Sequence, residues 1–173
     1  HMYATRYANA LEAAQTLAEN HEPLLGRILA WQEVIYTDNK LPVWLRESLV
    51  NILYLITEDG LWACAKPPIG DWCRPEDGLF GMNEDPRGCP QIECHPCSFL
   101  GNLPLVYLFP ELALATMRGY KAYQHPDGPM AWIWNDDGSG PCDMTSPGYR
   151  PDQRPHLAME YVIMIDRLIL ATQ

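Results

Sequence analysis

The sequence predicts a mainly α-helical fold with short strands and long loops. Over most of the chain, apolar residues recur at intervals of three and four, as they do on helices that bury one face. Between residues 61 and 81 they come instead in short runs separated by Pro and Gly, which is typical of short strands and turns. Residues 126–155 are rich in Pro and Gly and predict a long irregular excursion.

The first third of the chain predicts three helices. The apolar spacing predicts one helix over residues 7–19, and Pro23 is expected to begin a second helix that ends near Thr37. Leu41-Pro42 predicts an extended entry into a third helix, which Asp59-Gly60 ends.

The rest of the chain predicts two short strands and three helices. The strands are expected at residues 61–63 and 79–81, and the first of these helices at Phe99–Phe109. Another helix is predicted from Glu111 to Tyr123, and a strongly apolar last helix from His156 to Ala171.

Length and composition predict one domain over residues 3–173. A chain of 173 residues with 47% hydrophobic content is long enough to bury a core. His1-Met2 resembles the remnant of an expression tag, so it is excluded from the expected domain.

The charge of the chain argues against a nucleic-acid partner. The net charge is −10 and there is no run of Lys and Arg, which phosphate binding requires. No apolar stretch approaches the roughly 20 residues that span a bilayer, and no signal peptide opens the chain, so we expect a cytoplasmic protein without a transmembrane segment. Six Trp and nine Tyr suit a carbohydrate cleft, although ordinary cores use the same aromatic residues.

Glu84 is the first candidate for a catalytic residue. It follows the short apolar run Leu79–Met82 and precedes a segment rich in Pro, Gly and Cys. A carboxylate where regular structure gives way to a constrained loop, walled by apolar residues, is suited to acid chemistry tuned by burial. The alternative is an ordinary loop entry with a solvated carboxylate.

Two stretches carry a resemblance to a known family. LFGMNE followed by SFLGNLPLVYLFPELALATMRGY resembles the catalytic region of glycoside hydrolase family 116, the retaining β-glucosidases and β-xylosidases that include the non-lysosomal glucosylceramidases. AWQEVIYTDNKLPVWLRESLVNILYLITEDGLW is similar to a helical region upstream in that family, so the resemblance covers residues 7–125. It implies an (α/α)6 toroid of helical hairpins. Since such a toroid needs on the order of 300 residues, we expect this chain to be a fragment of a larger catalytic domain.

The resemblance implies that Glu84 is the nucleophile of a retaining β-glycosidase acting on a carbohydrate or glycoside, without a cofactor. The family's acid/base is an aspartate far downstream, which we expect outside this chain, so the isolated chain is expected to lack turnover. The sequence differs from the family at two stretches. Where the family has an Asp or a Thr-His pair, this chain has His95-Pro96-Cys97-Ser98. Where the glucosidases have a sugar-binding Pro-His-Asp stretch, this chain has Trp134-Asn135-Asp136.

Four further residues are candidates for binding the substrate. Trp62 and Trp72 could stack on a sugar ring, although a Trp more often simply packs. Asn135 and Asp136 follow an apolar island and could bind sugar hydroxyls, whereas Asn-Asp-Asp-Gly is also an ordinary turn.

A cysteine cluster offers an alternative function. Cys89, Cys94, His95 and Cys97 could bind zinc, and Cys94-x-x-Cys97 has the spacing of zinc-knuckle and redox pairs. Plain buried or free thiols are the other interpretation. In the alternative, the chain is a non-catalytic helical binding or assembly module. Its apolar faces would then pair with a second copy or with the remainder of the same polypeptide.

Overall fold

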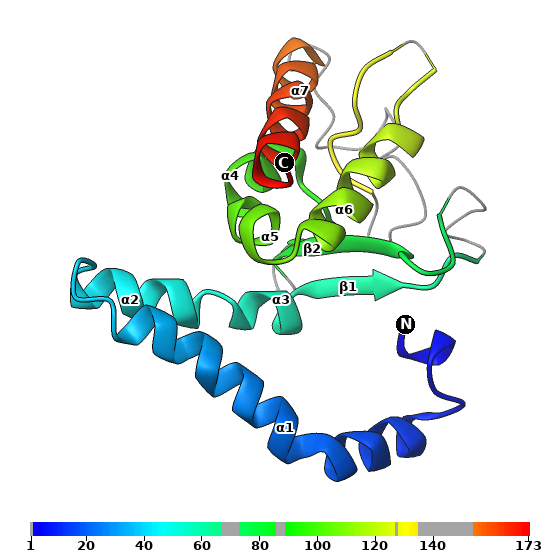
Figure 1. The fold of residues 1–173 in the computed structure, drawn as a ribbon. Coiled ribbons are helices and arrows are strands. Elements are labelled where there is room, and N and C mark those ends of the chain that lie inside the picture. Colours follow the sequence, from blue (N-terminus) through cyan, green and yellow to red (C-terminus); the bar gives the residue numbers. More distant parts are fainter. Residues whose placement is uncertain (1, 67–72, 86–88, 127, 135–153) are drawn as a thin grey trace. The chain divides into compact units, whose positions relative to one another are not determined.

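The computed structural model describes residues 2–66, 73–85, 89–126, 128–134 and 154–173. Within them the protein is mainly helical, with one small three-stranded sheet, which confirms the predicted class (Figure 1). The chain divides into two compact units. The smaller comprises Tyr3–Glu58, and the larger comprises Met2 with Asp59–Gln173.

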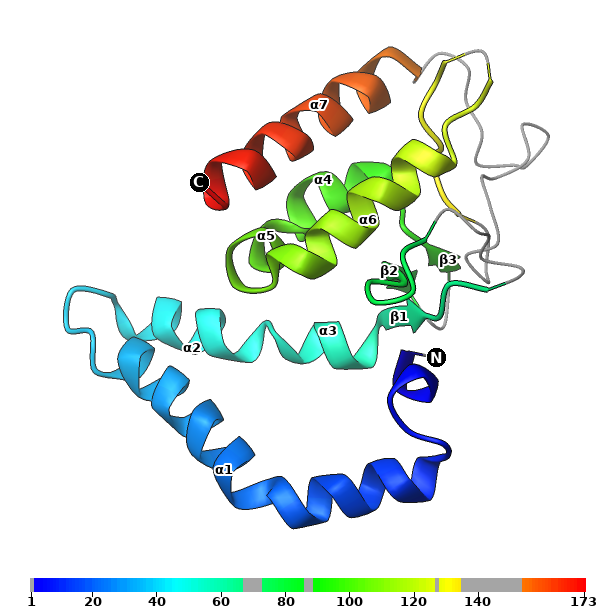
Figure 2. The same ribbon diagram turned by 45° about the vertical axis from the view of Figure 1, so that its right-hand side comes forward.

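Helix α1 of the smaller unit spans Ala10–Tyr36 without a break. Its first turn is capped reciprocally: the Asn9 side chain accepts from the Glu12 N–H, and the Glu12 carboxylate accepts from the Ala8 N–H. The predicted break at Pro23 is wrong, since Pro23 lies inside the helix. A proline inside a helix removes one N–H donor and crowds the preceding turn, so the helix bends. It continues through the bend because good helix formers lie on both sides. Figure 2 shows this change of direction within α1.

Helices α2 (Val43–Asn51) and α3 (Tyr54–Glu58) occupy the place of the predicted third helix. Pro42 is extended, with φ −63° and ψ 151°, which confirms the predicted entry. Around residues 52–53 the N–H groups of Leu55 and Ile56 bond to carbonyls three residues earlier, so a tighter turn interrupts the α-helix.

The sheet of the larger unit is antiparallel, in the order β1-β2-β3. Strand β1 (Gly60–Ala63) and the start of β2 (Leu79–Asp85) lie where the short apolar runs predicted strands. Strand β3 (Cys89–Ile92) was expected to be loop, because its Pro and Cys residues lack the alternation of a strand. Proline is tolerated there because β3 is the last strand in the order.

Helices α4 (His95–Gly101), α5 (Leu103–Leu108), α6 (Pro110–Ala122) and α7 (Arg154–Ala171) complete the larger unit. The helix predicted at Phe99–Phe109 is thus two short helices. Each of α4, α5 and α6 has Pro in its first turn, where the missing N–H costs nothing and a new helix starts. None of the described helices combines the length and the apolar character needed to cross a membrane.

The core of the larger unit lies between the sheet and the helices. Helix α6 packs on β2, and α7 packs along α4, α5 and α6 (Figure 2). The apolar island Met130–Trp134 also belongs to this core, since Trp134 is fully buried and its backbone N–H donates to the carbonyl of Ile92 in β3.

Candidate functional site

Glu84 lies near the end of β2, the central strand of the sheet. The strand begins with the buried residues Leu79–Gly81 and ends with polar residues. The Glu84 side chain is exposed, so the burial expected from the sequence is not found and the carboxylate faces solvent, as in the alternative interpretation. The pairing of β2 with β3 is irregular between Asn83 and Asp85, on either side of Glu84. Such irregularities redirect side chains at the edges of sheets and next to functional sites.

Two thiols lie beside this carboxylate. The Cys97 thiol donates to Glu84 Oε1 at 3.5 Å, and the ligand atoms of Glu84, Cys94 and Cys97 all lie within 4.8 Å of one another. Cys94 directly precedes α4 and is buried, whereas Cys97 lies in the first turn and is exposed.

Both thiols are protonated at neutral pH, because Cys94 is buried and the Cys97 sulfur, on an exposed residue, is partly shielded from water. Burial raises the pKa of Cys94 to about 12. It also raises the pKa of Cys97, to which the negative charge of Glu84 adds. A redox-active thiol needs a lowered pKa, so this environment does not suit redox catalysis.

Glu93 is a buried carboxylate at the same corner, and no pattern in the sequence marks it. Oε1 accepts from the Met82 N–H at 2.6 Å, while Oε2 accepts from the hydroxyls of Ser98 at 2.5 Å and Tyr120 at 2.9 Å. Burial raises the pKa of Glu93, and these three hydrogen bonds oppose that shift. The backbone of Glu93 has a positive φ of 56°. Glu93 thereby ties together β2, α4 and α6 where β3 turns into α4.

His95 faces the core instead of the thiols. Its backbone N–H donates to the Trp132 carbonyl at 2.8 Å, and its Nδ1 lies 3.4 Å from the Ala131 carbonyl, which places the proton on Nδ1. The ring lies against Tyr120, with ring centres 4.3 Å apart. Burial lowers the pKa of His95 to about 4, so the imidazole is neutral at neutral pH.

The predicted zinc set is therefore only partly assembled. Cys94 and Cys97 lie close together. The third possible ligand beside them is Glu84, whereas the sequence suggested His95 as a ligand. Cys89 lies in β3, but its side chain is outside the described part.

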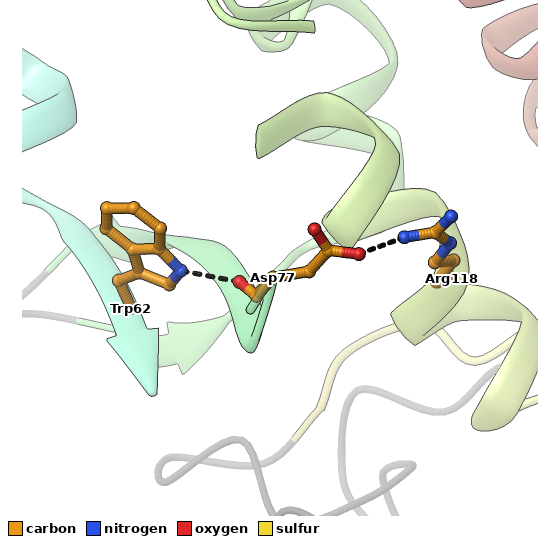
Figure 3. Close-up of polar contacts among 3 residues, drawn as sticks. All are labelled: Trp62, Asp77 and Arg118. Atoms are coloured by element: carbon orange, nitrogen blue, oxygen red, sulfur yellow. Dashed lines mark hydrogen bonds and ion pairs between the residues drawn. The ribbon is translucent and has the colours of Figure 1, made fainter. Parts of the chain in front are cut away.

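Trp62, a predicted sugar-binding residue, links β1 to the turn before β2. Its Nε1–H donates to the Asp77 carbonyl at 2.8 Å, and the Asp77 carboxylate forms an ion pair with Arg118 of α6. Figure 3 shows Asp77 between these two side chains. The indole is half-buried. Trp72, Asn135 and Asp136, the other predicted sugar-binding residues, lie outside the described residues.

The grooves on the described surface include two that Glu84 does not line. One, of about 440 Å³, lies between α6 and α7 and is lined by apolar side chains such as Leu114, Ile165 and Ile169. The other, of about 500 Å³, lies along the first half of α1.

Comparison of the chain with protein families, with curated proteins and with solved structures found no match. The resemblance described above and the roles that it implies therefore stay predictions.

Proposed function

We propose that this chain is part of the (α/α)6 catalytic domain of a retaining β-glycosidase, of the glucosidase, xylosidase or glucosylceramidase type, and that Glu84 is its nucleophile. The observation that carries the proposal is the contrast between two acids at one corner of the sheet. Glu93 is fully buried and holds the corner together, whereas Glu84 presents an exposed carboxylate at the end of the central strand. The resemblance around LFGMNE assigns the nucleophile to the same residue.

In this reaction the Glu84 carboxylate attacks the anomeric carbon and forms a glycosyl-enzyme ester, while an acid protonates the departing oxygen. Water, activated by that second group, then hydrolyses the ester and restores Glu84. The Cys97 thiol donates to Oε1 and so orients the attacking carboxylate. Retention requires the second carboxyl group about 5 to 5.5 Å from Glu84, and we assign it to a part of the protein outside the described residues.

The test is covalent labelling with 2-deoxy-2-fluoro glycosides of glucose and xylose that carry a leaving group able to depart without protonation. Such probes need the nucleophile but not the acid. We expect intact-mass analysis to show one added fluorosugar, and peptide mapping to place it on Glu84. Glu84→Gln should abolish the label.

The matched control is Glu111→Gln, which neutralises another exposed acid of the same unit and should leave labelling unchanged. Absence of label from the original protein, or the same label on Glu84→Gln, would contradict the assignment.

A second candidate function, a helical assembly module, is favoured by helix α1. None of its residues is buried, and apolar side chains along its whole length are exposed, among them Leu17, Leu29 and Val34. Apolar surface of this extent drives association. In this function α1 pairs with a second copy of the chain or with the remainder of the same polypeptide, and the mass of the chain in solution tests it.

A further inference from the structure

Three side chains of different elements converge at the end of β2. Glu84 comes from the strand, while Cys94 and Cys97 flank the start of α4. Their ligand atoms lie within 4.8 Å of one another, and the Cys97 sulfur lies 3.5 Å from Glu84 Oε1. Two thiols and a carboxylate are the donor types that bind zinc in proteins.

The spacing of these atoms fits one small cation. A tetrahedral Zn²⁺ with Zn–S bonds of about 2.3 Å and a Zn–O bond of about 2.0 to 2.2 Å separates a sulfur from an oxygen ligand by about 3.6 Å, and two sulfurs by about 3.8 Å. The observed separation of Cys97 Sγ and Glu84 Oε1 is close to the first of these values. The other two separations are at most 4.8 Å, so side-chain movements of about 1 Å would bring all three ligand atoms to bonding distance of one ion.

The backbone around the three side chains is held from several directions. The Glu93 N–H donates to the Met82 carbonyl, which joins the end of β2 to the residue before Cys94. The Ser98 N–H donates to the Cys94 carbonyl, which fixes the turn that carries both cysteines. The buried Glu93 carboxylate links the same parts through Met82 and Ser98. Ligands on such a braced frame need little ordering when a metal binds.

We propose that Glu84, Cys94 and Cys97 form a binding site for a thiophilic divalent cation of the zinc class. Soft thiolates select such ions against Mg²⁺ and Ca²⁺, which prefer oxygen ligands. Three protein ligands leave one position of a tetrahedral ion for water or another small ligand. The site differs from the set that the sequence suggested, because it uses Glu84 and does not use His95. A Glu84 carboxylate that holds the ion is not free to attack a sugar, so the nucleophile role belongs to the metal-free protein and the two roles are tested separately.

The test is titration of the reduced, metal-stripped protein with Cd²⁺, which occupies zinc sites and gives a sulfur-to-metal charge-transfer absorption in the ultraviolet. We expect one tightly bound Cd²⁺ per chain with the absorption of two thiolates, and its displacement by Zn²⁺. Cys94→Ser and Cys97→Ser should each remove tight binding. Glu84→Gln should weaken it by at least about tenfold, the loss that even an outer-shell change can cause at a metal site.

Two control variants test whether the effect is local. Cys64→Ser changes a buried thiol near the end of β1, and Glu111→Gln changes an exposed carboxylate of α6, and both should bind Cd²⁺ as the original protein does. Cys97 is exposed, so Cys97→Ser should keep the circular dichroism spectrum and the thermal transition of the original. No charge-transfer band from the original protein, or unchanged affinity in a folded Cys97→Ser, would overturn the site. Because the readout needs no sugar, a failure here is distinct from a failure of fluorosugar labelling.

Discussion

At the scale of single residues, the buried Glu93 is the costliest feature of the candidate site. Removing a carboxylate from water costs several kcal/mol unless donors replace the lost hydration. A positive φ at a residue other than glycine adds about 1 to 3 kcal/mol and persists only where the surroundings determine it fully. Hydrogen bonds from the Met82 N–H and from the hydroxyls of Ser98 and Tyr120 offset these costs. Glu93 is therefore a positioning residue for the corner that carries Glu84, Cys94 and Cys97.

Tyr120→Phe tests this role because it removes one donor and keeps the ring. The Tyr120 hydroxyl is buried and donates to Glu93 Oε2. We expect the free energy of unfolding to fall by about 1 to 3 kcal/mol, since a buried carboxyl oxygen loses one of its hydrogen-bond donors. Urea unfolding at neutral pH measures the change.

The control is Tyr107→Phe in α5, where the side chain is 70% exposed. A surface change of this kind should alter stability by less than about 0.5 kcal/mol. If both variants lost the same free energy of unfolding, the hydrogen bond from Tyr120 to Glu93 would not stabilise this part of the protein more than an ordinary surface hydroxyl does.

The residues of the candidate site could be predicted from the sequence only where the signal was local. Glu84 stood out because an apolar run leads into it, and Cys94 and Cys97 because of their spacing. Glu93 gave no such signal. Its burial depends on Tyr120, 27 residues further along the chain, and no local pattern encodes that contact. His95 turned away from the thiols for a related reason, because its partner Ala131 lies 36 residues away.

At the scale of elements, strong apolar periodicity located the helices, and proline was the main source of error. Pro23 was expected to start a helix, yet it lies inside α1, where the residues on both sides continue the helix. One helix was expected at Phe99–Phe109, with Pro104 either kinking it or marking its first turn; Pro104 lies in the first turn of α5, which is separate from α4. A proline fixes one residue's backbone, but whether the helix bends or restarts depends on the neighbouring residues and their packing. Strand β3 was missed because pairing with β2 stabilises it despite its Pro.

Two glycines allow β2 and α6 to approach the ring of Trp134. A Cβ atom at Gly119 would lie 2.6 Å from Trp134 Cη2, and a Cβ atom at Gly81 would lie 3.0 Å from Trp134 Cζ3. Gly119→Ala therefore places a methyl group in occupied space. We expect a loss of about 1 to 3 kcal/mol from overpacking, larger than the gain of about 1 kcal/mol that alanine brings to a helix. Thermal unfolding followed by circular dichroism at the helix band measures it.

Gly26→Ala is the matched control in α1. No atom lies within 4 Å of the added methyl group, so only helix propensity acts and stability should rise by up to about 1 kcal/mol. The prediction for Gly119 is contradicted if both substitutions stabilise the protein to the same extent.

At the scale of the whole molecule, the two units differ in how much they bury. Seven residues of α6 are buried in the larger unit, among them Ala113, Met117 and Tyr120. In the smaller unit, none of the 27 residues of α1 is buried. An amphipathic helix in a soluble protein normally gains its stability by packing its apolar face. Helix α1 has the sequence of a packed helix but not the burial of one, which is what we expect of an element that completes its packing on another surface.

Self-association of the chain through α1 is the corresponding prediction. Leu25 and Leu29 lie one turn apart and are each about half exposed, at 52% and 53%. Light scattering with size-exclusion chromatography should give the original chain a mass above the 19.7 kDa of one copy. Replacing both leucines by Lys should lower that mass towards one copy, because the apolar face is interrupted by two charges.

The pair Gln15→Lys and Glu19→Lys adds Lys at exposed polar positions of the same helix and should leave the mass unchanged. A single-copy mass for the original chain would remove the basis of the assembly function. It would leave the proposed roles of Glu84 untouched, since the carboxylate belongs to the other unit.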